Sequence, residues 1–453
     1  MKPTLPQRLQ FWLSILGVSI PVCAFLLWAR HREISLPGLA AALVSLLLFC
    51  LLYLRFVPRW ICFWRSPAVS GSSALSSGKP PHHIEGKLFT TLLAVDLGFL
   101  LAAFLIRKST GVQGTFLESL SFWTCTDSGH YLDIAQDWYL SQGEMDRLVQ
   151  LVFLPGYPLA VRLMHLLVPN FLHAGLLISA LSFAGAGCVL YRLFCLDLPP
   201  REALRTIRVL CLLPGAFFFA APMSESLFLL LCASCLYLAR THRWLSGCLL
   251  GGLAAFTRSL GLTLIIPLLF EWIAAFRVVP KKARRRQLAR GAALFLIPGG
   301  FGVYCLINLA VAGNPFQFLI YQRVHWSQQP GWFFNTAYYQ TEMAQQCALS
   351  DLHTLLGLWL PNLLASFLSL LVMTLAVRHL RPSYTAWYLA YFLIAIGATW
   401  LLSAPRYLIA LIPTPLALAR LTRNPTADLV VSSVSLCGSI LYFYAFVLRW
   451  QVW

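Results

Sequence analysis

Long apolar runs separated by short polar segments recur along the whole chain. A helix needs about 20 apolar residues to cross a bilayer, and the runs at 9–29, 36–57 and 88–106 meet that length. Further runs bring the predicted number of spans to about thirteen; they lie at 172–194, 207–221, 225–240, 244–257, 259–276, 291–312, 353–377, 384–402, 405–420 and 428–448. A transmembrane barrel would instead alternate polar and apolar residues over about ten positions. The pattern therefore predicts an all-α, polytopic transmembrane helical bundle.

A polar stretch interrupts this pattern just after the third run. Residues 123–135 read Trp-Thr-Cys-Thr-Asp-Ser-Gly-His-Tyr-Leu-Asp-Ile-Ala and carry Asp127, His130 and Asp133. The apolar run at 157–168 is short and flanked by prolines, so we expect it to lie at the interface without crossing. The segment from 107 to about 154 is then a loop at one membrane face, carrying short interfacial helices.

The composition and charge support a membrane protein with a defined orientation. Of 453 residues, 59% are hydrophobic and 11% are charged, and 34 Lys and Arg against 16 Asp and Glu give a net charge of +18. The basic residues gather between spans, most densely at 281–286, which points to cytoplasmic loops and not to nucleic acid. Arg30, Arg32, Arg107 and Lys108 depart from this rule by falling on the outer side. The amino terminus is predicted inside and Asp127 outside.

Several chain-distant polar segments map to the same outer face as Asp127. They contain Ser224 and Glu225, Arg258, the aromatic segment 313–351, and Arg406 with Tyr407. Aromatic rings in segment 313–351 suit either an interfacial belt or sugar stacking. If that segment covers the site, its length suits a lid.

Four ordered motifs resemble the PIG-V family, whose eukaryotic members are glycosylphosphatidylinositol mannosyltransferase 2, within the GT-C class of membrane glycosyltransferases. The motifs are Trp123 with 127–135, then 153–158, 222–227 and 256–261, and two weaker ones are 313–316 and 405–407. The family usually has Trp directly before the acid, whereas here Thr-Cys-Thr separates Trp123 from Asp127. The resemblance covers about 87–423 and implies a GT-C-like fold and a mannosyltransferase activity.

The chemistry of sugar transfer assigns roles to these residues. Inverting transfer from a lipid phosphate needs one base for the acceptor hydroxyl, and Asp127 is the predicted catalytic base. The leaving phosphate needs cationic partners, for which Arg258 and Arg406 are the candidates. The other predicted substrate-binding residues are His130, Asp133, Glu225 and Tyr407. Glu225 is expected to contact acceptor or sugar.

Each of these residues also has a structural interpretation. A loop carboxylate such as Asp127 is commonly solvated, and Asp133 and Glu225 suit helix ends. Arg258 and Arg406 sit where long side chains reach lipid headgroups. Asp96 lies within an apolar span and is assigned to packing.

At the level of the whole protein, the alternative is a lipid or solute transporter or flippase without transferase activity. Repeated halves are typical of transporters, and no repeat is visible in this sequence. A noncatalytic scaffold would explain the spans but not the motif order.

The Ser- and Pro-rich stretch 70–83 predicts a linker. Residues 1–86 are thus a two-span appendage with that linker, and 87–453 are the transferase domain.

No metal site and no tightly bound cofactor are predicted, and a loosely bound divalent cation at the donor phosphate stays open. The expected partners are a polyprenyl- or dolichyl-phosphate sugar donor and a lipid or glycan acceptor, without nucleic acid. We expect the cell membrane in a prokaryote or the endoplasmic reticulum membrane in a eukaryote, with the active site on the extracytoplasmic or lumenal side. In a eukaryote the resemblance implies glycosylphosphatidylinositol biosynthesis.

Overall fold

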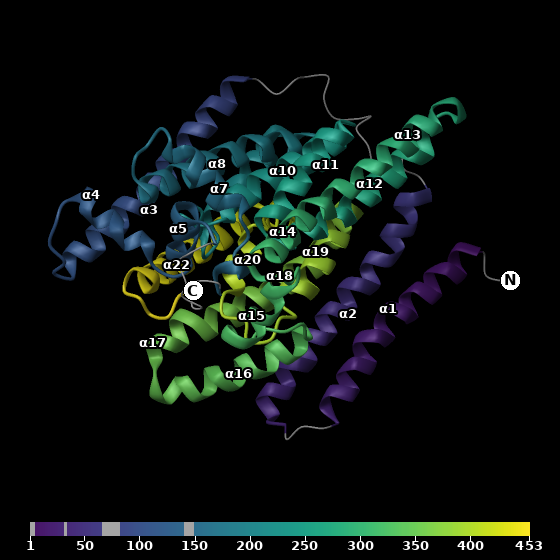
Figure 1. Ribbon diagram of the computed structural model, residues 1–453. Helices are drawn as coiled ribbons and strands as arrows, with labels where there is room; N and C mark the ends of the chain where they lie inside the picture. The colour runs from purple at the N-terminus through teal and green to yellow at the C-terminus, as the bar shows by residue number, and fades with distance from the viewer. Residues whose placement is uncertain (1–4, 31–33, 66–81, 140–148) are drawn as a thin grey trace.

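The computed structural model describes residues 5–30, 34–65, 82–139 and 149–453, and these residues are almost entirely helical (Figure 1). Within them no sheet forms, and the only β-contact is an isolated bridge between Pro330 and Ala398. The all-α prediction is confirmed. The predicted linker lies mostly outside the described residues.

Eight helical stretches of the described chain are long and apolar enough to cross a membrane, so the protein is an integral membrane protein. Seven of the helices in these stretches are α1 (Leu5–Ala29), α2 (Leu36–Arg65), α3 (His82–Ser109), α8 (Phe171–Cys195), α14 (Leu296–Ala312), α18 (Leu360–Ala376) and α22 (Pro425–Val447). The eighth stretch joins η5 (Ser259–Leu264) to α12 (Ile265–Val278).

Shorter helices pack between the long ones or cap the bundle. Those among the apolar helices are α9 (Pro200–Leu212), η4 (Ala216–Phe219), α10 (Glu225–Arg240), α11 (Trp244–Thr257), α19 (Pro382–Ala395) and α21 (Pro413–Leu421). Those near polar segments are α4 (Phe116–Ser119), η2 (Leu120–Thr124), α5 (Ser128–Asp137), α7 (Gly156–His165), α13 (Arg284–Ala292), α15 (Gln317–His325), α16 (Phe333–Ser350), α17 (Leu352–Thr354) and α20 (Ala404–Ile409).

Two predicted spans are each broken into shorter helices. The run at 207–221 stops at Leu212, because Pro214 cannot continue the helix and Gly215 adopts a φ of +94°. The run at 405–420 divides into α20 and α21, and Pro413 starts the second. The segment 313–351, which the sequence suggested as a long loop, is mostly helical, since α15 and α16 occupy most of it.

Apolar side chains fill the space between the central helices. The largest buried cluster includes Phe183, Phe219, Phe228 and Trp387. A second cluster, around Trp123 and its neighbours, packs η2 and α5 against α22. This second cluster fixes the segment that carries Asp127.

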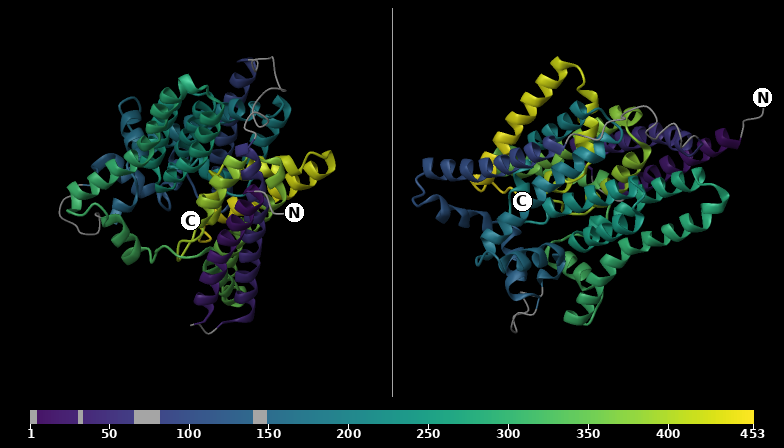
Figure 2. Two further views of the ribbon diagram at one scale, coloured as in Figure 1. Left: turned by 90° about the vertical axis from the view of Figure 1, so that its right-hand side faces the viewer. Right: turned by 90° about the horizontal axis from the view of Figure 1, so that it is seen from above.

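The amino-terminal helices form an adjacent antiparallel pair at one edge of the molecule (Figure 2). Of the two, α2 packs against α16, α18 and α19. Arg55 on α2 donates to the carbonyl of Thr374 at 2.9 Å, and the Ser35 amide donates to the Tyr338 hydroxyl at 3.1 Å. The division into an appendage and a transferase domain stays a prediction.

Candidate active site

Asp127 is held at the amino-terminal end of α5 by buried neighbours. Trp123 is buried and its ring lies 5.7 Å from that of Phe446, while Tyr131 and Ile134 anchor the inner face of α5. The Asp127 side chain does not cap its helix. Its carboxylate is therefore available for a partner elsewhere in the fold.

That partner is Arg406 on α20, which is 279 positions away in the sequence and donates to Asp127 Oδ2. The Nε of the same arginine lies 3.1 Å from Glu225 Oε1. Arg258 donates to the same Glu225 oxygen and, at 3.1 Å, to the Ser224 hydroxyl. These contacts join the predicted acids and arginines in one cluster.

Burial makes this arrangement electrostatically strong. The side chains of Arg406, Arg258 and Glu225 are 8%, 9% and 1% exposed, whereas that of Asp127 is 21% exposed. A buried charge is costly unless it is paired, and the two acids balance the two arginines. The Oε2 atom of Glu225 is buried without a hydrogen-bond partner among the described residues.

Tyr131 extends the polar cluster toward the interior. Its hydroxyl lies 2.9 Å from the Ser224 hydroxyl. Burial is the main cause of a raised pKa for Tyr131; Arg258 lowers that pKa, and the Glu225 and Asp127 carboxylates raise it further. The phenol therefore stays protonated at neutral pH and helps to hold Ser224 beside Arg258.

A cavity of about 330 Å³ lies next to the cluster. Its volume is in the range of small-molecule sites. It is lined by the segments around α5, the junction of α11 and η5, α15 and α20. The lining residues are Thr126, Asp127, His130, Tyr131, Val152, Phe153, Leu154, Thr257, Arg258, Ser259, Leu260, Gln322, Trp326, Gln328, Leu402, Ser403, Arg406, Tyr407 and Trp453.

Five predicted site residues line this cavity together: Asp127, His130, Arg258, Arg406 and Tyr407. The His130 ring stacks on Phe153 at a centroid distance of 4.8 Å. The Tyr407 ring lies 5.2 Å from the Arg258 guanidinium carbon and 6.0 Å from that of Arg406. Such a ring favours a fixed orientation of both cations.

The other two predicted residues lie outside the cavity lining. Glu225 is behind the arginines and contacts them directly. Asp133 is on the exposed side of α5, where the Gln150 amide donates to it at 3.3 Å. Their predicted contacts with substrate stay predictions.

Sequence reasoning gave no role to Ser224, Gln322 or Trp453. Ser224 stands beside Glu225 in the 222–227 motif, but its contact with Arg258 depends on how the helices pack. Trp326 is one of several aromatic residues in 313–351, and it lines the cavity; the Pro330–Ala398 bridge lies shortly after it in the chain. Trp453 has no sequence signal.

Within the described part of the chain, no three His, Cys, Asp or Glu residues come close enough to hold a metal ion. Asp127 and His130 share the cavity without a third such ligand. The expectation about a loosely bound cation at the donor phosphate stays open.

Comparison with known proteins identifies the family of the chain. The family model described as mannosyltransferase (PIG-V) matches residues 100–335. The chain belongs to the PIG-V family. Asp127, His130, Glu225 and Arg258 lie within the matched residues, whereas Arg406 and Tyr407 lie beyond them.

Three rodent relatives have similar segments. GPI alpha-1,6-mannosyltransferase 2 of Mus musculus is 37% identical over 163 residues, which are 33% of this chain and 31% of that protein. The Rattus norvegicus protein of the same name is 37% identical over 158 residues (32% and 30%), and that of Cricetulus griseus is 36% identical over 163 residues (33% and 31%). The match thus spans about a third of the length of these relatives.

Proposed function

We propose that this protein transfers a hexose, specifically mannose, from a polyprenyl- or dolichyl-phosphate carrier to a hydroxyl of a lipid- or glycan-linked acceptor, with inversion. The observation that carries the proposal is the cavity in which Asp127, Arg258 and Arg406 meet. Membership of the PIG-V family supports mannose as the sugar and a lipid phosphate as its carrier. The acceptor of the rodent relatives is, by their name, of the glycosylphosphatidylinositol class.

In the proposed reaction, Asp127 accepts the proton of the acceptor hydroxyl. The acceptor oxygen then bonds to the anomeric carbon of the sugar, while the bond from that carbon to the phosphate oxygen breaks on the opposite face. The electron pair leaves with the lipid phosphate, which is stable as an anion and needs no protonation by the enzyme. One carboxylate and a cationic phosphate site are sufficient for this chemistry.

Arg406 links the two halves of the proposed reaction. It contacts Asp127 at the cavity and Glu225 behind it. A donor phosphate competes with Asp127 for this guanidinium, and occupation of Arg406 by phosphate leaves the carboxylate free to take a proton. Glu225 acts in this proposal as a positioning residue that holds both arginines.

The same proposal covers the architecture. The long helices, with α10, α11, α19 and the broken segments at 207–221 and 405–420, make up a GT-C-like arrangement of about thirteen membrane segments. The Asp127 end of the bundle faces the extracytoplasmic or lumenal side, because the basic loops lie at the other end. In a eukaryotic cell the family favours the endoplasmic reticulum membrane.

The decisive experiment compares purified wild type with Asp127→Asn. Release of polyprenyl phosphate from radiolabelled polyprenyl-phosphate-mannose is measured with membrane extract as acceptor. We expect the variant to lose about 100-fold or more in turnover, since general-base catalysis contributes that much, while donor still raises its thermal midpoint. Glu118→Gln is the matched control, because Gln keeps the capping box that Glu118 forms with Thr115.

Two results would contradict the proposal. Equal release by wild type and Asp127→Asn would remove Asp127 as the base. Absence of release from folded wild type, together with movement of the lipid donor across a vesicle bilayer, would favour a transporter or flippase.

A further inference from the structure

A second, larger cavity of about 440 Å³ lies at the other end of the helices from Asp127. Two helices connect the ends. The first, α8, begins near Tyr157, whose ring lies 5.5 Å from that of Tyr131 in the candidate active site, and it ends just before Asp197. The second, α19, begins after Arg381 and leads toward Ser403. Asp197 and Arg381 line the second cavity. The proposed transfer reaction makes no use of it.

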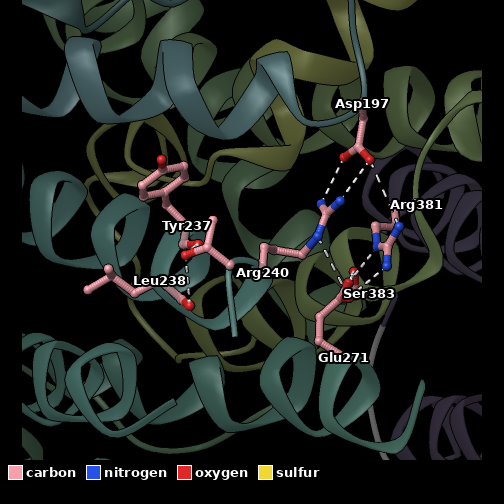
Figure 3. A network of polar contacts seen from close by, with 8 residues as sticks. Asp197, Tyr237, Leu238, Arg240, Glu271, Arg381 and Ser383 are labelled. Carbon is pink, nitrogen blue, oxygen red and sulfur yellow. Dashed lines mark hydrogen bonds and ion pairs between the residues drawn. The ribbon is translucent and has the colours of Figure 1, made fainter. Parts of the chain in front are cut away.

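Asp197 and Arg381 in the wall of this cavity belong to a neutral network of ion pairs, which Figure 3 shows. Arg240 donates to both oxygens of Asp197 at 2.8 Å, and Arg381 donates to both oxygens of Glu271 at 2.6 and 2.7 Å. The Ser383 hydroxyl donates to Glu271 at 2.6 Å. Two acids balance two arginines, so this wall is rigid and contributes no net charge.

Other cations at the cavity are not balanced. Arg420 shares the single carboxylate of Glu202 with Arg423, at 2.8 and 3.1 Å. The Nε–H of Arg420 is buried without a hydrogen-bond partner in the described residues. Arg420 lines the cavity, so an anion there would balance this excess charge.

Arg59 is the clearest excess charge. It is exposed at the carboxyl-terminal end of α2, lines the cavity, and has no ion-pair or hydrogen-bond partner among the described residues. The stretch 66–81 that follows α2 contains neither Asp nor Glu, so it offers no carboxylate to this arginine. The cavity therefore carries a net positive charge.

Most of the remaining lining is apolar. Phe63, Phe194, Leu198, Leu380 and Leu416 contribute to it. A lining that combines cationic and apolar side chains matches a phosphodiester attached to hydrocarbon better than a free inorganic anion. Basic sites at the cytoplasmic face of a membrane protein also meet the anionic leaflet.

We propose that this cavity binds the phosphate of an anionic phospholipid headgroup, with Arg59 and Arg420 as its partners and the apolar lining residues against the start of the acyl chains. Free phosphate offers the same charged group without the hydrocarbon. The proposal does not depend on the transfer reaction.

The test is native mass spectrometry of the full chain in a neutral detergent, titrated with phosphatidylglycerol or phosphatidylcholine. We expect phosphatidylglycerol to bind about tenfold more tightly than phosphatidylcholine. Arg59→Gln should weaken phosphatidylglycerol binding about tenfold, the loss of one charge-assisted contact. Arg285→Gln is the matched control, because Arg285 is an exposed arginine of α13 outside the cavity lining.

A parallel titration with inorganic phosphate, read as a shift in thermal midpoint, distinguishes the two sources of phosphate. Stabilisation by millimolar phosphate that Arg59→Gln abolishes, without any preference among the lipids, would overturn the lipid assignment. Equal weakening by Arg59→Gln and Arg285→Gln would show only general surface attraction and would overturn the site. Unchanged thermal midpoints of both variants without lipid show that the fold is intact.

Discussion

Glu225 is the most buried charge of the candidate active site. One of its oxygens serves both arginines, and its side chain is 1% exposed. Because it lies outside the cavity lining, its effect on substrate must pass through Arg258 and Arg406. This distinguishes it from Asp127, which reaches the cavity itself.

We expect Glu225→Gln to raise the KM for the lipid-phosphate donor about tenfold while leaving the KM for the acceptor unchanged. The neutral amide removes the counter-charge of two buried guanidinium groups and lets them shift, and breaking such a pair costs about 3–5 kcal/mol. Steady-state kinetics with each substrate varied in turn make the measurement. Glu118→Gln serves as the control, and Glu225→Asp should recover part of the donor affinity. Equal rises in both KM values would indicate general misfolding instead of a role in positioning.

The junction of α11 and η5 determines where Arg258 points. Gly261 folds back onto the end of α11, and a Cβ at this position would lie 2.5 Å from the carbonyl carbon and 2.6 Å from the carbonyl oxygen of Ala254. Its amide also donates to the Arg258 carbonyl at 2.8 Å. The atoms that this Cβ would meet belong to the backbone, so the clash cannot be relieved by moving a side chain.

We therefore expect Gly261→Ala to destabilise the protein by about 1–3 kcal/mol, in the range of overpacked sites, and to weaken donor binding by displacing Arg258. Gly302→Ala is the matched control, because a Cβ on Gly302 in α14 meets no atom within 4 Å. The control should be neutral or slightly stabilising. Thermal unfolding followed by intrinsic fluorescence, with and without donor, compares the two. A Gly261→Ala protein as stable as the control would show that the two backbones separate easily.

The apolar runs predicted which parts of the chain are helical more reliably than where each helix ends. Runs such as 9–29 and 36–57 correspond to α1 and α2 because a long apolar stretch in a membrane has few alternatives to a helix. The run at 405–420 was predicted as one span but forms two helices, because prolines at 405 and 413 are compatible with helix starts as well as with a kink. Length and hydropathy alone do not distinguish one kinked helix from two separate helices.

The sequence pattern predicted that several polar residues share one end of the bundle, but not which side chains contact one another. The alternation of membrane faces placed Arg258 and Arg406 on the Asp127 side, and the structure brings all three to one cavity. Glu225 lies between the arginines because of how α10, η5 and α20 pack. The sequence pattern of one helix does not predict that packing. An acid at the start of an apolar helix satisfies the same local pattern whether it faces solvent or two buried cations.

Over the whole molecule, α1 and α2 are held by specific contacts as well as by apolar packing. Phe25 lies 5.4 Å from Phe334 of α16, and the Trp28 indole donates to Asn335 at 3.0 Å. In a bilayer, lipid is as apolar as these helices, so such packing and hydrogen bonds decide whether two segments stay together. The predicted appendage is thus tied to α16, which leads back to the cavity through the segment carrying Trp326.

A specific protease site inserted within 66–81 tests how strong this attachment is. We expect the two fragments to migrate together on size exclusion after cleavage in mild detergent, because α2 contacts α16, α18 and α19. Phe25→Ala should promote their separation, whereas Leu26→Ala should not, since Leu26 is 61% exposed and Phe25 is 6% exposed. If the cleaved wild-type fragments separate and 82–453 keeps its thermal midpoint and its transfer activity, residues 1–81 are an independent appendage and the contacts to α16 add little to stability.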